Sequence, residues 1–185
     1  MAKLLLTAWI LRQLVRRLLS FNAAPRSYQD RTWQRRGFHV LDVPTAVALR
    51  ISGHFNSVVE IGSASGDRII AIKKGRPALR TTAMDIGPDY ATDRTIDGVE
   101  FRRYAPSAIE PGSLVFCVGT LAYMSRAELS ELMRYVANGH CALLLFEPQP
   151  PFQTRTSMRR ASDSWYHPYG SIANDCGLTE VIDDG

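Results

Sequence analysis

The sequence predicts an α/β fold built on a doubly wound, mostly parallel sheet. From residue 43 onward, short apolar runs typical of buried strands alternate with runs of helical character. Alternation of this kind implies a parallel sheet with helices on both faces. The chain has 185 residues, of which 45% are hydrophobic and 22% charged, so it is long enough for one domain with a sizeable core.

Each element has a local signal. The segment 43–51 suits a helix because Pro44 stands near its start. Strands are expected at 58–61, 81–85, 99–103, 114–118, 142–147 and 179–182. Further helices are expected at about 67–74, 88–94, 125–137 and 168–176. Ser125 and Glu128 form a capping box that begins one of them. Residues 148–168 are expected to be a long polar loop.

The first strand ends in an acid and runs into a turn of small residues. Glu60 is followed by Gly62 and Gly66, and a helix-like run begins at Asp67. Glycines let the backbone pass close to a ligand and adopt positive φ. Free N–H groups at the helix start would face that ligand, and Glu60 would accept hydrogen bonds from an amine or hydroxyl. A tight strand–helix turn without any ligand remains the alternative.

A second strand, 81–85, ends in Asp85, 25 residues after Glu60. In a doubly wound sheet these two strand ends are neighbours at the carboxyl edge, where ligands bind. A carboxylate there can accept hydrogen bonds from both hydroxyls of a ribose. The alternative for Asp85 is a solvated turn residue or a helix cap.

This pair of motifs resembles class I S-adenosylmethionine (SAM)-dependent methyltransferases, over residues 43–185. The resemblance implies a Rossmann-like fold, SAM as cofactor, and a loop that holds the methionine and ribose portion. It implies cofactor contacts at Glu60, Gly62, Ser63, Ala64, Gly66, Asp85, Ile86 and Gly119.

The chain departs from the family pattern at three places. Ala64 stands where the fuller motif has its middle glycine, and no acid occurs in 103–107, where the family often has one that contacts adenine. The family sheet ends with a hairpin of two strands, and the sequence up to Gly185 leaves room for the first and not the second. The last strand is therefore expected to be missing, in a chain that is either a shortened member or incomplete. These departures keep open a non-catalytic Rossmann-like SAM-binding or interaction module.

A nucleotide-dependent oxidoreductase is the second alternative. The dinucleotide fingerprint G-x-G-x-x-G would require glycine at positions 64 and 67, which are Ala64 and Asp67 here. This argues against NAD or FAD.

For the acceptor, the sequence favours a small molecule or a sugar over nucleic acid. Tyr123, Arg155 and Tyr166 are expected to line its pocket, with the 148–168 loop as a lid. His167 is placed to act as a general base near neutral pH, and its alternative is a hydrogen-bonded structural histidine. Tyr123 is equally compatible with a core aromatic. No Cys/His spacing suggests a metal site.

Residues 1–42 form a basic arm ahead of the 43–185 domain. Residues 1–40 hold 8 bases and 1 acid, a net charge of +7, whereas the other 14 bases and 17 acids give −3. Apolar residues recur on one helical face up to Leu18, and Arg12 interrupts the stretch far short of a membrane span. A packing helix, a membrane-surface helix and a transit peptide all fit. Cysteine usage, at 3 residues, favours a reducing, cytoplasmic setting.

The segregated basic and apolar faces of residues 1–22 predict association with anionic membranes. Deleting these residues should reduce pelleting with anionic vesicles and leave SAM affinity unchanged. If the full-length protein does not pellet with vesicles at low salt, the packing-helix alternative stands instead.

Overall fold

The computed structural model describes residues 43–87, 93–147, 156–161 and 164–179, all within one compact unit, Val40–Gly185. Six strands form the main sheet: β1 Ser57–Ile61, β2 Arg80–Asp85, β3 Arg94–Ile96, β4 Val99–Arg103, β5 Leu114–Val118 and β6 Ala142–Phe146. Within these ranges no helix is long and apolar enough to cross a bilayer.

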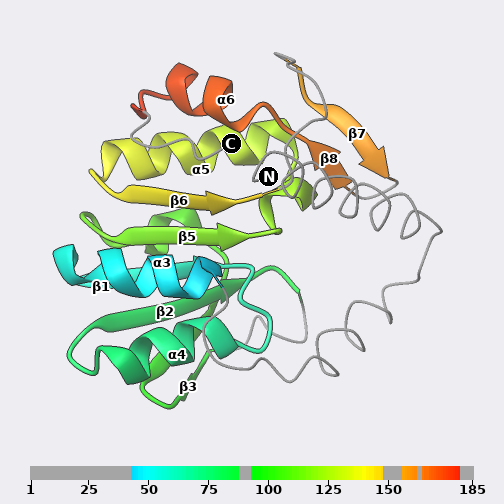
Figure 1. The fold of residues 1–185 in the computed structure, drawn as a ribbon. Helices are drawn as coiled ribbons and strands as arrows, with labels where there is room; N and C mark the ends of the chain where they lie inside the picture. The colour runs from blue at the N-terminus through cyan, green and yellow to red at the C-terminus, as the bar shows by residue number, and fades with distance from the viewer. Residues whose placement is uncertain (1–42, 88–92, 148–155, 162–163, 180–185) are drawn as a thin grey trace, which may run out of the picture. The chain divides into compact units, whose positions relative to one another are not determined.

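The strand order is β3-β4-β2-β1-β5-β6, and every neighbouring pair is parallel except β3 with β4 (Figure 1). The chain runs outward from β1 through β2 to β4, then crosses to the other side of β1 to form β5 and β6. The switch point therefore lies between β1 and β5. The expected doubly wound, mostly parallel α/β sheet is confirmed, and its ligand crevice is expected at the carboxyl ends of these two strands.

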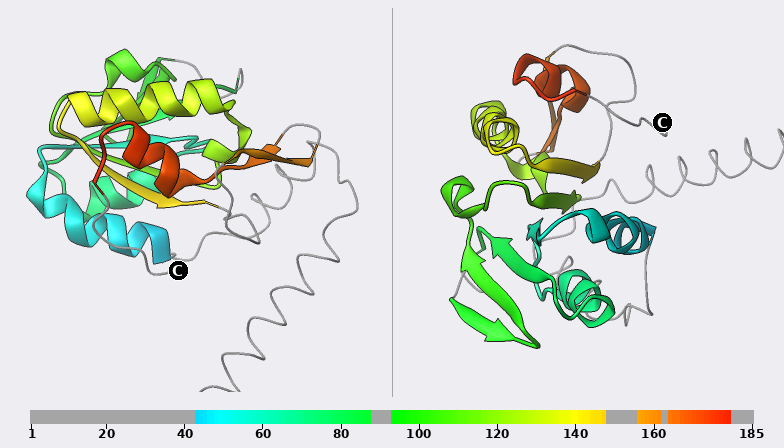
Figure 2. Two further views of the ribbon diagram at one scale, coloured as in Figure 1. Left: turned by 90° about the horizontal axis from the view of Figure 1, so that it is seen from above. Right: turned by 90° about the vertical axis from the view of Figure 1, so that its left-hand side faces the viewer.

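Helices cover both faces of the sheet (Figure 2). On one face lie α3 (Val43–Ile51) and α4 (Asp67–Gly75), and on the other lie α5 (Arg126–Asn138) and α6 (Tyr169–Asp175). Short 3-10 turns complete the layers: η1 Ser52–His54, η2 Pro106–Ala108 and η3 Leu121–Tyr123.

Burial on both faces explains why β1 reads as a continuous apolar run. All of its residues are buried, and Val58 and Val59 belong to different hydrophobic clusters, because successive side chains point to opposite faces. Each buried aliphatic side chain of this size stabilises the fold by about 1.5–3 kcal/mol.

The start of α5 is set by its capping box, as predicted. Ser125 Oγ accepts a hydrogen bond from Glu128 N at 3.3 Å, and Glu128 Oε2 accepts one from Ser125 N at 2.7 Å. Leu129, Leu132, Met133 and Val136 then bury one face at helical spacing. The helix is thereby held against the sheet immediately after the carboxyl end of β5.

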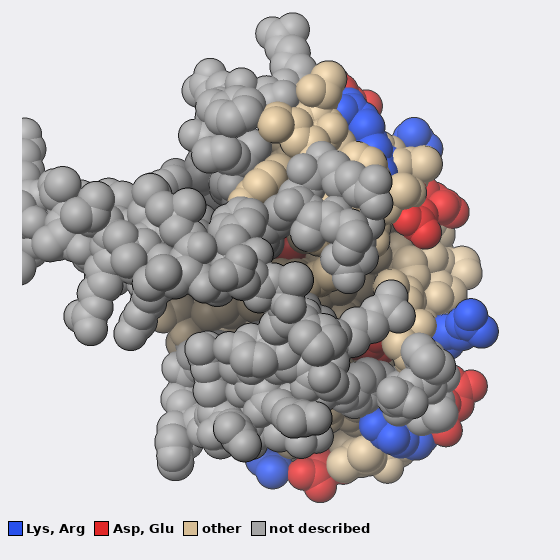
Figure 3. Space-filling view, turned by 90° about the vertical axis from the view of Figure 1, so that its right-hand side faces the viewer, with Lys and Arg blue, Asp and Glu red and all other residues tan. Residues whose placement is uncertain are grey.

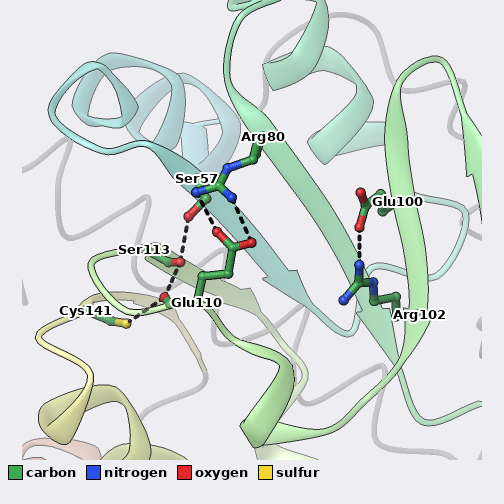
Figure 4. Close-up of polar contacts among 7 residues, drawn as sticks. All are labelled: Ser57, Arg80, Glu100, Arg102, Glu110, Ser113 and Cys141. Carbon is green, nitrogen blue, oxygen red and sulfur yellow. Dashed lines mark hydrogen bonds and ion pairs between the residues drawn. The ribbon is translucent and has the colours of Figure 1, made fainter.

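Polar contacts tie the strands together at the opposite, amino edge (Figure 4). The Arg80 guanidinium binds both carboxylate oxygens of Glu110, at 2.9 and 2.7 Å. Ser57 and Ser113, at the starts of neighbouring strands, share a buried hydrogen bond of 2.7 Å. These contacts lie at the edge of the sheet away from the switch point.

Three predicted elements need correction. Arg94, expected at the end of a helix, begins β3; residues 88–92 lie outside the described ranges. Part of the expected 148–168 loop is an antiparallel hairpin of β7 (Met158–Ala161) and β8 (Ser164–Tyr166). Thr179 is not in a strand, and 180–182 lie outside the described residues. The hairpin and β3 are short, and cross-strand pairing rather than a local sequence signal forms them.

Candidate functional site

The loop after β1 is fixed by backbone hydrogen bonds to the end of β2. Gly62 N and Ser63 N both donate to Met84 O, at 2.7 and 3.3 Å, and Gly66 N donates to Ser63 O at 2.8 Å. Gly66 is the N-cap residue of α4. The loop is therefore a rigid turn at the carboxyl edge, where the motif placed it.

The glycines of this loop are required by contacts within the protein. Gly62 has φ +74°, and a Cβ there would lie 2.0 Å from Thr120 Oγ1. Gly66 has φ +81°, and its Cβ would lie 2.4 Å from the Phe101 ring. Ala64 also has positive φ, at 47°, and is not a glycine. The loop thus has positive φ at both glycines of the motif. Ala64 has positive φ as well, where a side chain strains the backbone.

Asp85 holds the same loop through its carboxylate. Its Oδ2 accepts from Ala64 N at 2.9 Å and its Oδ1 accepts from Gly87 N at 2.7 Å. Each carboxylate oxygen has a second acceptor position, so these bonds leave capacity for a ligand hydroxyl. Ile86 beside it is 55% exposed, as an apolar surface for a ligand would be.

Glu60 is buried at the end of β1 beside the first turn of α4. Its carboxylate is 1% exposed, and Oε1 lies 3.7 Å from Arg68 Nη1. Such a pair is stable when buried only if the geometry satisfies both charges.

Open space and a buried hydroxyl mark the switch point. Gly119, at the end of β5, has φ +67°, and a Cβ there would meet no atom of the described residues within 4 Å. The Ser63 hydroxyl is buried and makes no hydrogen bond within the described part of the chain. A buried polar group without a partner is costly, so it suits a ligand that brings one. Together these two observations fit a small cofactor lying across the ends of β1 and β5.

Glu147, directly after β6, was missed by the sequence analysis. Its Oε1 accepts from Thr120 N at 2.8 Å and from Leu121 N at 3.0 Å, which caps η3. Burial raises the pKa of this carboxyl, while hydrogen bonds from the backbone of η3 lower it. Glu60 and Asp85 were found because each is an acid at the end of an apolar strand. The same pattern in the sequence could have found Glu147.

Of the three residues expected to line the acceptor pocket, the structure describes two, Tyr123 and Tyr166. Tyr123, in η3, is 40% exposed. Tyr166 lies in β8, which packs against η3, so the fold brings the segments of these two tyrosines together. Arg155 lies outside the described residues.

His167 is fully buried and both ring nitrogens are engaged. Nε2 lies 3.0 Å from Met124 O, which only accepts, so Nε2 carries the proton. Nδ1 lies 2.8 Å from Ser157 Oγ, and in the neutral ring it accepts from that hydroxyl. Burial lowers the pKa of His167. This geometry favours the structural alternative over a general base.

The segment 103–107, which lacks the acid that the family often has, places Tyr104 beside the core. Tyr104 N donates to Asp85 O at 2.9 Å. The Tyr104 hydroxyl is buried and makes no hydrogen bond, and burial raises its pKa. This phenol lies one residue beyond β4, on the side of the sheet where the resemblance expects adenine.

Figure 3 faces the carboxyl edge of the sheet. The described Lys, Arg, Asp and Glu side chains in this view alternate in sign along one rim, with uncharged surface between them. Among the described residues visible in this view, basic side chains do not form a continuous stripe of the kind that binds a phosphate backbone.

The two unusual backbone positions predict opposite stability effects. Gly62→Ala should destabilise the protein by at least about 2 kcal/mol, because the methyl group meets Thr120 at positive φ. Ala64→Gly should stabilise it by up to about 1 kcal/mol by relieving the left-handed backbone. Chemical denaturation of the two variants measures both effects. A loss of stability in Ala64→Gly would contradict the backbone assignment.

His167 should make stability fall in acid. Its pKa is lowered in the folded state, so its contribution is present above the unfolded value of about 6.5 and is lost as pH falls. The stability difference between wild type and His167→Gln should therefore shrink between pH 8 and pH 5 in denaturant titrations. A difference that stays constant with pH would show that the ring is not coupled to folding.

Comparisons with known proteins place several methyltransferases among similar structures. The chain is 18% identical to mitomycin 7-O-methyltransferase MmcR, covering 58% of this chain and 38% of that one with a TM-score of 0.43. It is 15% identical to human N-acetylserotonin methyltransferase in complex with SAM (56% and 33% coverage, TM-score 0.43). It is 17% identical to the sugar N-methyltransferase KedS8 from Streptoalloteichus sp ATCC 53650 (74% and 60% coverage, TM-score 0.48).

The chain thus spans between a third and three fifths of the length of these three proteins. No model of a protein family matches the chain, and a search of curated proteins finds no match. The fold is therefore read from the strand order and connections of this chain itself: a Rossmann-like α/β sheet with its glycine loop and strand-end acids at the switch point.

Proposed function

We propose that this protein is a SAM-dependent methyltransferase acting on a small molecule or sugar. The observation that carries the proposal is the convergence at the switch point. The glycine loop after β1, the Asp85 carboxylate after β2 and the open space at Gly119 after β5 meet at one edge of the sheet.

The cofactor would be held by groups of this chain that retain hydrogen-bonding capacity. Asp85 would accept from ribose hydroxyls through the acceptor positions that Ala64 N and Gly87 N leave open. The buried Ser63 hydroxyl would gain a partner, and the Glu60 carboxylate would face the cationic amino-acid end.

When bound, SAM supplies a sulfonium methyl group, an electrophile that needs little activation from the protein. The protein's part is to hold an acceptor in line and to keep water away. Gly119 has no side chain, which leaves room for both partners beside the end of β5. Tyr123 and Tyr166, on elements in contact, are the proposed acceptor wall.

The charge of the body supports a small acceptor rather than nucleic acid. Residues 41–185 hold 14 bases and 17 acids, a net charge of −3. A nucleic-acid site needs a basic stripe to neutralise phosphates. The acceptor is therefore proposed to be a small molecule or sugar that enters over η3 and β8.

Isothermal titration with SAM tests the cofactor assignment. Asp85→Asn keeps the side-chain shape and removes the charge, so SAM affinity should fall by about 1–3 kcal/mol through weaker charge-assisted hydrogen bonds. Asp97→Asn is the matched control: Asp97 lies in the β3–β4 turn and pairs with Lys74, and its loss should leave SAM affinity unchanged.

Unchanged SAM affinity in a folded Asp85→Asn variant would remove Asp85 from the site. Binding of NAD by the wild type, with none of SAM, would support the oxidoreductase alternative and overturn the proposal. Tight SAM binding with no methyl transfer to any acceptor offered would favour the non-catalytic module.

A further inference from the structure

Glu147 presents one carboxylate oxygen that the fold uses and one that it does not. Thr120 N and Leu121 N donate to Oε1, which fixes the side chain and caps η3. Oε2 is buried and accepts no hydrogen bond from the described residues. Capping a 3-10 turn needs a single acceptor, which a serine or asparagine also supplies. The second oxygen is therefore not explained by the fold.

A buried carboxylate oxygen without a donor is costly to keep. Leaving a buried charged acceptor unsatisfied costs more free energy than leaving a neutral group unsatisfied. Burial also raises the pKa of Glu147, which is the response expected of a carboxylate that lacks a cationic or hydrogen-bonding partner. A ligand that carries an N–H or O–H group removes this cost.

The position of Glu147 connects it to the candidate site. Thr120, whose N–H binds Oε1, has its side chain against the Cα of Gly62 in the glycine loop. Gly119 N donates to Phe146 O at 3.0 Å, which aligns the ends of β5 and β6. Gly119 itself faces open space. Glu147 thus lies beside the crevice, on the side away from Asp85.

The surroundings of Glu147 point to an organic donor. Burial raises the pKa of the Cys117 thiol, and the nearby charges of Glu147 and Glu60 raise it further. Glu60 has Arg68 as its ion-pair partner, whereas Glu147 forms no salt bridge with any residue in the described ranges. In the described part of the chain, no three His, Cys, Asp or Glu side chains are grouped to hold a metal ion.

We propose that Oε2 of Glu147 binds the proton-bearing nucleophile, an amine or a hydroxyl, of the methyl acceptor. The proposal rests on the proposed function and narrows it. Glu147 accepts the N–H or O–H of the nucleophile, orients its lone pair toward the crevice, and holds at Oε2 the proton that the nucleophile gives up. Acceptors whose nucleophile is a carboxylate or phosphate oxygen are excluded, because two like charges would be buried together.

The test uses two ligands that differ at the reacting position. S-Adenosylhomocysteine has a bare thioether there, and sinefungin has a carbon that bears an ammonium group. The ammonium is attracted by a carboxylate beside the methyl position, and the attraction is strong in a buried site. Wild-type protein should bind sinefungin at least tenfold more tightly than S-adenosylhomocysteine in isothermal titration.

Glu147→Gln keeps an oxygen for Thr120 N and Leu121 N and removes the charge. It should lower sinefungin affinity about tenfold and leave S-adenosylhomocysteine affinity unchanged. Glu110→Gln is the matched control, because it neutralises a carboxylate at the amino edge, in the Arg80 pair of Figure 4. It should change neither affinity. Thermal unfolding checks that both variants are folded.

Each outcome decides the matter. Equal loss of both affinities in Glu147→Gln would show a structural cap and overturn the proposal, as would no loss of either. Equal binding of the two ligands by the wild type overturns it without any variant, so a misfolded variant cannot rescue it. If the wild type binds neither ligand, the proposed function fails and the Glu147 assignment fails with it.

Discussion

The hydrogen bond from Ala64 N to Asp85 Oδ2 is the interaction on which the candidate site depends. It joins the loop after β1 to the end of β2 at 2.9 Å, and it holds Ala64 in a left-handed conformation that a non-glycine residue avoids. The same loop positions Gly62 against Thr120 and so sets the distance between the ends of β1 and β5. One carboxylate therefore organises the loop that lies between the ends of β1 and β5.

Much of this arrangement was predictable because its signals are local. The strand β1, its terminal acid and the glycine turn lie within a dozen residues, and the capping box of α5 lies within four. The reason for the glycines was different from the one expected. Thr120 and Phe101, both distant in sequence, occupy the space that side chains at Gly62 and Gly66 would need.

What the sequence could not supply depends on pairing between distant segments. The hairpin of β7 and β8 has no clear alternation of apolar and polar residues, and pairing between its two strands defines it. The role of Glu147 depends on Thr120, 27 residues earlier, because the Glu147 carboxylate accepts a hydrogen bond from the Thr120 backbone N–H. In the sequence, His167 is a titratable group within a polar segment. In the structure its ring is buried and its Nε2–H donates to Met124 O. Burial lowers the pKa of the ring, which favours its neutral form.

The contact between His167 and Met124 also closes a ring of chain 43 residues long, with η3 at one end and β8 at the other. Closing a ring of that length costs conformational entropy before any local contact is gained. The packing of η3 against β8 should therefore form late in folding. In the native state, η3 and the hairpin should open together as one cooperative unit, and their amides should share a single exchange rate with solvent. Under the proposed function, access for an acceptor would then depend on how often η3 and the hairpin open. This opening would be separate from the rigid glycine loop after β1.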